Sequence, residues 1–124
     1  MSKKYDFQYV VIGSGPAGAT VATTLAKAKK GVALVEGHFF GGSNLNTRDV
    51  PYAVALDFAH TYAKINSAPE YANQDFSINL PSVISSELKA VINAGGNNKK
   101  LYEDSAVVCL NGYANFLDPH TIAI

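Results

Sequence analysis

Gly13, Gly15 and Gly18 constrain this chain more than any other feature, because they stand between two runs of opposite character. Residues 7–12 before them are apolar and rich in β-branched and aromatic side chains, which predicts a buried strand. Residues 16–30 after them are rich in Ala, Thr, Leu and Lys, with one apolar face at helical spacing. The glycine spacing at this strand-to-helix turn is typical of a loop that holds a pyrophosphate.

Each glycine has a separate task in such a loop. The first permits the tight turn that leaves the strand, the second lets the backbone approach a phosphate, and the third lets the helix pack on the sheet. The helix N-terminus adds free N–H groups and a partial positive charge. A plain strand–turn–helix, whose glycines serve geometry alone, is the alternative.

A second strand and an acidic residue complete the unit. Gly31 is expected to end the helix, and residues 32–35 predict a second buried strand. Glu36 follows this strand, where a carboxylate accepts hydrogen bonds from ribose hydroxyls and disfavours a 2′-phosphate. The βαβ unit spans about 30 residues, the usual length of the motif. FAD and NAD sites share this pattern, so it does not choose between them.

The middle of the chain is predicted to contain loops and helices. Residues 37–49 contain Gly, Ser and Asn and predict a loop. Asp49 is placed to cap a helix that has Pro51 in its first turn. Residues 69–79 predict another loop, and Ser82 is placed to cap the next helix.

The last part of the chain, residues 95–124, is predicted to contain the end of a helix and two more strands. Residues 95–96, both glycine, are expected to stop the second of these helices. Residues 106–110 predict a third buried strand, and residues 121–124 begin a fourth after a turn at residues 118–119. The order of elements predicts an α/β fold, a Rossmann-like βαβ domain with a central, mostly parallel sheet over residues 1–124.

The composition argues against several classes of partner. Ten Lys and Arg balance ten Asp and Glu, so the zero net charge gives no support for nucleic acid or an anionic membrane. No apolar run is long enough for a membrane span or a secretory signal, so a cytoplasmic location is expected. The single Cys109 excludes an internal disulfide. His38, His60 and His120 have no ligand spacing, so no metal site is predicted.

Three segments resemble, in order, the flavoprotein disulfide reductases, the pyridine nucleotide-disulfide oxidoreductase family that includes glutathione reductase and dihydrolipoamide dehydrogenase. Residues 5–18 resemble the FAD-binding start of that family, and residues 32–43 resemble its second strand and flavin-side loop. Residues 107–116 carry a Gly-x-Ala-x-Phe pattern similar to a later strand. The resemblance covers nearly the whole chain and is weaker over residues 52–100.

The resemblance implies FAD as cofactor, with NAD(P)H as electron donor and a homodimer in the full-length protein. It implies that the adenosine binds to Glu36 and the pyrophosphate to residues 13–18. The implied cofactor-binding residues are Gly13, Ser14, Gly15, Pro16, Ala17, Gly18, Glu36, Gly37, Gly41, Gly42, Ser43, Asn44, Gly112, Tyr113 and Ala114.

The family's redox segment is altered in this chain. In the family it reads Gly-Gly-Thr-Cys, four residues, then Cys, with a Pro and a Lys beyond. The two cysteine positions here hold Asn44 and Asp49, and the lysine position holds Ala53. Neither an amide nor a carboxylate forms a disulfide, so dithiol–disulfide chemistry by the usual route is excluded. Asp49 is a candidate acid for proton transfer beside the flavin, and a helix N-cap is the simpler alternative.

The family continues into an NAD(P) domain and a dimerisation domain, so this chain is expected to be a fragment of a longer protein. Three functions stay open. One is an oxidoreductase without a redox disulfide, such as a transhydrogenase or a reductase that passes electrons directly from flavin to an acceptor. The others are a degenerate nucleotide-binding or regulatory module without turnover, and a single-domain NAD-binding protein.

Overall fold

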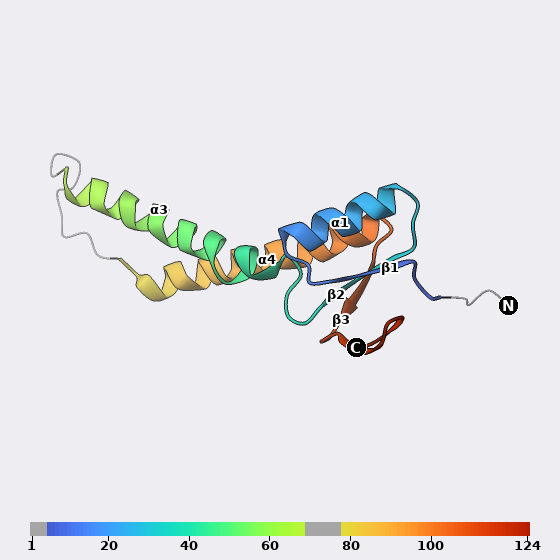
Figure 1. The fold of residues 1–124 in the computed structure, drawn as a ribbon. Helices are drawn as coiled ribbons and strands as arrows, with labels where there is room; N and C mark the ends of the chain where they lie inside the picture. Colours follow the sequence, from blue (N-terminus) through green and yellow to red (C-terminus); the bar gives the residue numbers. More distant parts are fainter. Residues whose placement is uncertain (1–4, 69–77) are drawn as a thin grey trace.

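Three parallel strands form the sheet at the centre of the fold (Figure 1). The computed structural model describes residues 5–68 and 78–124. β1 (Tyr9–Ile12), β2 (Val32–Glu36) and β3 (Val108–Asn111) lie in the order β1-β2-β3, and both neighbouring pairs are parallel. The predicted α/β fold with a parallel sheet is confirmed.

Burial is concentrated on β2, the central strand. Its residues 32–35 are at most 1% exposed, because β2 has a neighbouring strand on each side. β1 and β3 are edge strands of the described sheet, and each packs against one neighbour only. The prediction that both are buried is therefore wrong. The large apolar side chains exposed on them are Tyr9, Val10, Ile12 and Val108.

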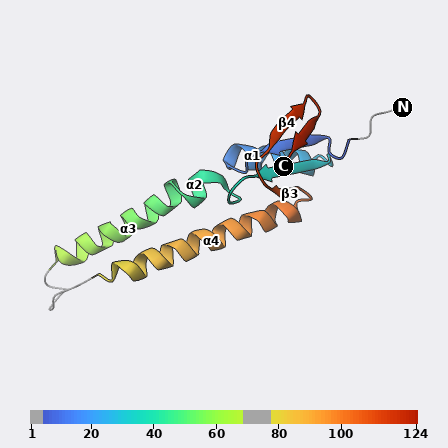
Figure 2. The same ribbon diagram turned by 90° about the horizontal axis from the view of Figure 1, so that it is seen from below.

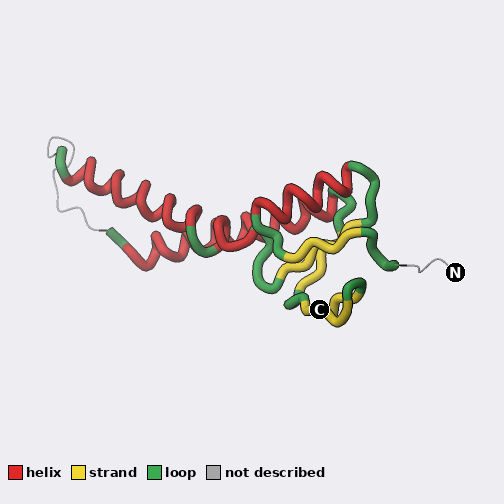
Figure 3. Tube along the Cα trace, viewed as in Figure 1, coloured by secondary structure: helices red, strands yellow, loops and turns green. Residues whose placement is uncertain are grey.

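Two helices lie on one side of the sheet and a hairpin lies on the other (Figure 3). α1 (Pro16–Lys27) follows β1, and the end of α4 (Leu80–Asp104) lies beside it. The core that they share with β2 consists of Ala22, Ala26, Val32, Leu34, Phe40, Tyr102 and Val107.

The hairpin is made of β4 (Asn115–Asp118) and β5 (Thr121–Ala123), which pair antiparallel. The predicted strand at residues 121–124 therefore exists, as does the turn before it. It pairs with β4 in a separate two-stranded sheet and does not extend the parallel one.

α3 (Asp49–Asn66) and α4 form a long antiparallel pair that projects away from the sheet (Figure 2). No residue of α3 is buried. Residues 69–77, most of the loop predicted between these helices, lie outside the described residues. Within the described ranges, no helix has both the length and the apolar character needed to cross a membrane.

Left-handed residues other than glycine end α1 and α4. Lys29 (φ 58°) follows α1, and its N–H donates to the carbonyl of Ala26 at 2.8 Å. A residue in this conformation closes the last helical turn, so Lys29 and not Gly31 ends the helix. Ala106 (φ 63°) does the same after α4, and the third strand consequently begins at Val108.

A short helix, α2 (Gly42–Asn46), lies in the segment 37–49 that was predicted to be a loop. The side-chain amide of Asn46 donates to the carbonyls of Phe39, Phe40 and Gly42 at 3.2, 3.1 and 2.8 Å. These contacts supply the backbone carbonyls with a donor inside the segment. They tie the end of α2 back to residues 39–42.

α4 runs through residues 95–96, so the stop predicted there is wrong. A glycine in a helix interior costs only about 1 kcal/mol relative to alanine, and α4 packs against α1, α2, α3 and β3. The N-cap of α4 is Asn79, whose side-chain oxygen accepts a hydrogen bond from the N–H of Ser82 at 3.2 Å. Ser82 was predicted to be the cap, and it is the donor instead.

Candidate cofactor-binding site

The turn between β1 and α1 has the geometry of a phosphate-binding loop. Gly13 has φ 93°, a conformation that favours glycine, and its N–H donates to the carbonyl of Val35 at 2.8 Å. A Cβ on Gly18 would overlap the carbonyl oxygen of Gly13, so only glycine lets α1 approach the turn this closely. A Cβ on Gly15 would meet nothing within 4 Å. The space beside Gly15 is open to a ligand.

The N-terminus of α1 faces this space without a protein cap. Gly15 occupies the N-cap position, where no side-chain hydrogen bond is made, and Pro16 has no N–H. The first turn contains no acidic residue. The N–H groups of Ala17 and Gly18 and the partial positive charge of the helix therefore fit an anionic ligand.

The carboxylate of Glu36 is held by Ser14 from across the loop. The backbone N–H of Ser14 donates to Oε2 at 2.9 Å and the hydroxyl donates to the same oxygen at 2.6 Å. The N–H of His38 donates to Oε1 at 3.0 Å. Burial raises the pKa of Glu36, but hydrogen bonds from Ser14, His38 and Gly37 outweigh it and hold the pKa below its usual value. Glu36 is therefore an anionic acceptor at neutral pH.

The segment after β2 returns to the phosphate loop. Gly41 (φ 107°) and Gly42 (φ 71°) take left-handed conformations, and the N–H of Gly41 donates to the Ser14 hydroxyl oxygen at 2.9 Å. A Cβ on Gly42 would lie 2.6 Å from the Cα of Gly15. The two glycines thus let the segment that resembles the family's flavin-side loop pack directly against the phosphate loop.

Residues 112–114, the last of the implied cofactor-binding segments, lie at the same end of the sheet. The N–H of Gly112 donates to the carbonyl of Glu36 at 2.9 Å. The ring of Tyr113 covers Gly37, where a Cβ would be 2.8 Å from the ring, and the Tyr113 hydroxyl lies 2.8 Å from Nε2 of His38. His38 is missing from the implied cofactor-binding residues. It meets Tyr113 across a separation of 75 residues, and no short-range pattern indicates that contact.

Most of the implied cofactor-binding residues therefore gather where the three parallel strands end, the edge at which open α/β sheets bind ligands. Ser43 and Asn44 lie on α2 with exposed side chains. The residues at the strand ends are Gly13, Ser14, Gly15, Pro16, Ala17, Gly18, Glu36, Gly37, Gly41, Gly42, Gly112, Tyr113 and Ala114.

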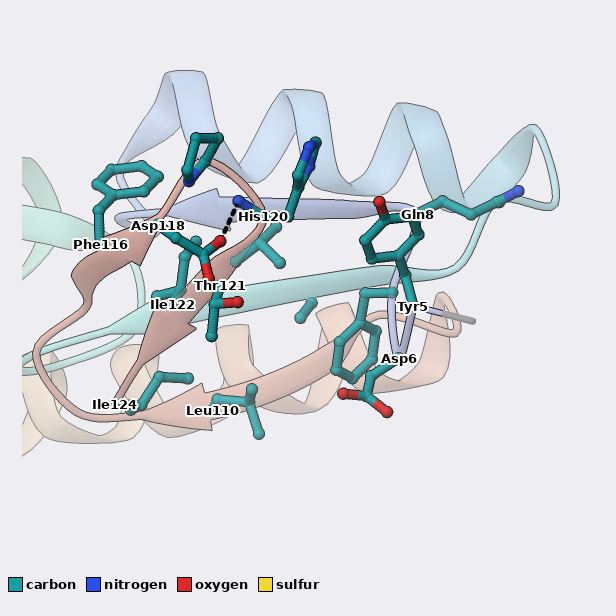
Figure 4. Close-up of a pocket in the computed structure, with 14 residues that line it drawn as sticks. Tyr5, Asp6, Gln8, Leu110, Phe116, Asp118, His120, Thr121, Ile122 and Ile124 are labelled. Carbon is teal, nitrogen blue, oxygen red and sulfur yellow. Dashed lines mark hydrogen bonds between the residues drawn. The ribbon is translucent and has the colours of Figure 1, made fainter. Parts of the chain in front are cut away.

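A cavity lies on the face of the sheet opposite α1, between the sheet and the β4–β5 hairpin (Figure 4). Its volume is about 1000 Å³, and Tyr5, Leu110 and Ile122 are among the side chains that line it. Asp118 accepts a hydrogen bond from the N–H of His120 at 2.7 Å in the hairpin turn, which lowers the pKa of Asp118. None of the implied cofactor-binding residues lines this cavity, so it is separate from the site.

Cys109 lies half-buried in β3. Burial raises the pKa of its thiol, and the nearby charge of Glu103 raises it further. A thiol with a raised pKa is a poor nucleophile at neutral pH. Among the described residues, no group of three or more His, Cys, Asp and Glu side chains is placed to hold a metal ion.

Known proteins match this chain along almost its whole length. The family model for pyridine nucleotide-disulphide oxidoreductases matches residues 7–122. This chain belongs to that family. Soluble pyridine nucleotide transhydrogenase of Vibrio cholerae serotype O1 is 31% identical over 127 residues, which cover 100% of this chain and 27% of the relative. Dihydrolipoyl dehydrogenase of Mycoplasma pneumoniae is 27% identical over 122 residues, covering 96% of this chain and 27% of the relative.

A solved structure agrees with this assignment to the pyridine nucleotide-disulphide oxidoreductases. The HOCl-induced flavoprotein disulfide reductase RclA from Escherichia coli matches with a TM-score of 0.76 and 26% identity, over 94% of this chain and 24% of that chain. The chain thus spans about a quarter of the length of these relatives. The family resemblance expected from the sequence is confirmed.

The altered redox segment is the main departure from the family. At the two positions where the sequence resemblance places the family's cysteines, the side-chain amide of Asn44 donates a hydrogen bond to Oδ2 of Asp49. Asp49 is the first residue of α3, and Arg48 holds the N-cap position without a side-chain hydrogen bond. The prediction that Asp49 caps the helix is therefore wrong. Its carboxylate contacts Asn44, and a polar contact joins the two positions of the family's disulfide.

The family depends on flavin and pyridine nucleotide, and the site fits a dinucleotide. The open space at Gly15 admits a pyrophosphate, and the uncapped first turn of α1 offers it N–H donors. The charged carboxylate of Glu36 offers acceptors for hydroxyl groups.

Proposed function

We propose that this chain is the N-terminal cofactor-binding part of a FAD- and pyridine-nucleotide-dependent oxidoreductase that works without a redox disulfide. The observation that carries the proposal is the pairing of an intact dinucleotide cradle with an Asn44–Asp49 hydrogen bond at the family's disulfide positions. The residues that would form the cradle are present, and Asn44 and Asp49 stand at the two cysteine positions of the resemblance.

The proposal of FAD is supported because different residues of the cradle suit different parts of the cofactor. The turn at residues 13–18 and the N-terminus of α1 would hold the pyrophosphate, because they offer N–H donors and room for close approach. Glu36 would hold the adenosine ribose through its charged carboxylate. The flavin supplies the redox chemistry when bound, and the protein supplies its orientation.

The redox segment supports electron transfer that bypasses protein thiols. Asn44 and Asp49 cannot be oxidised to a disulfide, and Cys109 lies in β3, on a different element from both of them. Electrons would therefore pass from reduced flavin to the acceptor directly. A second pyridine nucleotide is the acceptor that we favour, because a curated relative that matches the whole of this chain is named as a soluble pyridine nucleotide transhydrogenase.

The test uses the full-length protein, purified without added flavin. We expect the visible absorbance band of oxidised flavin in the preparation, and bleaching of that band by NADH or NADPH under anaerobic conditions. Recovery of the band on addition of an oxidised pyridine nucleotide would mark transhydrogenation. A protein that neither carries nor takes up FAD would refute the proposal.

A degenerate binding module is the second candidate function. The loss of both cysteines and the presence of Ala53 at the lysine position favour it. It predicts the flavin band without bleaching by either reduced nucleotide, so the same experiment separates the two functions.

The remaining proposals concern the setting of the protein. A homodimer is proposed for the full-length form on the family resemblance. The absence of a nucleic-acid or anionic-membrane partner is proposed because the net charge is zero. A cytoplasmic location is proposed because the one cysteine, Cys109, is a free thiol, which fits a reducing compartment. Gel filtration of the full-length protein tests the dimer, and cell fractionation tests the location.

A further inference from the structure

Ser14 is the one polar residue that is fully buried among the residues that the structure describes, with 0% of its surface exposed. It lies in the phosphate loop, at a position where the fingerprint does not require a hydroxyl. Its partners come from two other segments of the site, 22 and 27 residues further along the chain. Ser14 is therefore the point at which three parts of the site meet.

The contacts of Ser14 have a defined direction. Its hydroxyl donates to Oε2 of Glu36 at 2.6 Å, and its oxygen accepts from the N–H of Gly41 at 2.9 Å. Its backbone N–H donates to the same Oε2 at 2.9 Å. A carboxylate oxygen has two lone pairs, so Ser14 fills both on Oε2. Oε1 has one regular hydrogen bond, from the N–H of His38 at 3.0 Å, and the N–H of Gly37 acts on the carboxylate more weakly, so Oε1 is the oxygen that keeps a lone pair for a ligand.

We propose that the Ser14 hydroxyl is a positioning group that turns Glu36 so that Oε1 meets the ribose of the adenosine, and that it ties the flavin-side loop at Gly41 to the same carboxylate. The proposal rests on FAD binding at this site. It names a residue that acts through Glu36 and has no contact of its own with the ribose. Recognition of the ribose and placement of the flavin-side loop become parts of one hydrogen-bonded unit.

Removal of the hydroxyl has two consequences at once. In a Ser14→Ala variant, the N–H of Gly41 loses its acceptor and Oε2 of Glu36 loses its shorter hydrogen bond. Hydrogen bonds to charged groups are stronger than neutral ones. The carboxylate of Glu36 is then held less firmly, by backbone N–H groups alone, chiefly those of residue 14 and His38. The adenosine then loses a fixed acceptor, although Glu36 itself is unchanged.

The experiment measures the affinity of the full-length apoprotein for two ligands. One is FAD, and the other is an FAD analogue whose adenosine ribose lacks both hydroxyls. We expect Ser14→Ala to weaken FAD about ten-fold. The affinity for the analogue should fall much less, because the analogue gives Glu36 nothing to bind and feels only the loss of the Gly41 contact. The matched control is Thr20→Val, which removes an exposed hydroxyl of α1 that bonds only its own helix at Pro16.

Two results would overturn the proposal. Equal loss of affinity for FAD and for the analogue would show that the hydroxyl supports the fold and does not position Glu36. Unchanged FAD affinity, as in Thr20→Val, would show that the hydroxyl has no role in binding. A Glu36→Gln background supplies a further check, because Ser14→Ala should cost little more once the carboxylate is gone.

A measurement on the ligand-free protein separates this proposal from the proposed function. Carbon NMR of the Glu36 carboxyl follows its titration, and Ser14→Ala should raise the pKa of Glu36 because the charged form loses a donor. If the wild-type protein takes up no FAD, the proposed function fails, whereas this titration still decides whether Ser14 holds the carboxylate. An unchanged pKa in Ser14→Ala would refute that hold.

Discussion

Two glycines of the same loop, Gly15 and Gly18, are expected to respond to alanine in opposite ways. A Cβ on Gly18 would lie well inside 3.0 Å of the carbonyl oxygen of Gly13, 3.1 Å from its carbonyl carbon and 3.4 Å from Cγ1 of Val11. The obstructing atom belongs to the backbone, so α1 would have to move by roughly 1 Å to restore ordinary contact.

The cost of Gly18→Ala follows from two opposing terms. Overpacking of a close contact costs about 1–3 kcal/mol, and the upper end applies because a backbone carbonyl cannot rotate away. Alanine returns about 1 kcal/mol through its better helix propensity. We therefore expect the free energy of unfolding to fall by about 2 kcal/mol, measured by urea denaturation of the apoprotein with circular dichroism.

Gly15→Ala is the matched variant. Gly15 has φ −62° and ψ 175°, which alanine adopts readily, and a Cβ there meets nothing within 4 Å. We expect the free energy of unfolding to change by less than about 0.5 kcal/mol. The methyl group would instead occupy the space proposed for the pyrophosphate. FAD affinity should fall by at least about 100-fold, which is about 2.7 kcal/mol of binding free energy.

Two outcomes would refute this reasoning. Wild-type FAD affinity in Gly15→Ala would mean that the ligand does not approach Gly15. Wild-type stability in Gly18→Ala would mean that α1 does not pack on the turn as closely as the structure shows.

Three further predictions concern other parts of the site. The folded-state pKa of Glu36 lies below its ordinary value near 4.5, so its contribution to stability should be complete above that pH and be lost as the pH falls through the folded value. In thermal melts, Glu36→Gln should therefore reduce the loss of stability at acid pH, and an identical loss in the variant and the wild type would contradict the assignment. Asp49→Asn should leave FAD content unchanged and lower turnover by about 100-fold if the carboxylate moves a proton, whereas full turnover in steady-state assays would exclude that role. Asn46→Ala should lower the free energy of unfolding by about 1–2 kcal/mol, since the side-chain amide that donates to the carbonyls of Phe39, Phe40 and Gly42 is lost. Thr47→Ala, which removes one exposed contact, is the control, and equal values for both would refute the argument.

Sequence patterns over a few neighbouring residues correctly predicted the elements that depend on local sequence. The turn at residues 13–18 and the strands on either side of α1 follow from glycine spacing and apolar runs, and both are present. The errors arose where distant packing decides. α4 continues through residues 95–96 because it packs on four other elements, which outweighs the modest cost of two glycines. β1 and β3 have the composition of buried strands but lie at the edges of the described sheet.

The ends of α1 and α4 depend on local backbone conformation, but the residues that adopt it have no clear preference for that conformation. Lys29 and Ala106 adopt left-handed conformations that glycine usually provides. Neither residue type indicates such a conformation in advance. Asn79 caps α4, and residue type alone does not distinguish it from Ser82, because Asn and Ser are equally good capping residues.

The amino-acid sequence by itself determined the family, the phosphate loop and the loss of the disulfide, because each depends on residue identity at fixed spacing along the chain. Only the tertiary structure decided what the site's side chains do. The bond of Ser14 to Glu36, the cover of Gly37 by Tyr113 and the contact of Asn44 with Asp49 depend on where the backbone carries each side chain. Two of these three join residues more than 20 positions apart, and no pattern in the sequence encodes the meeting of such distant side chains.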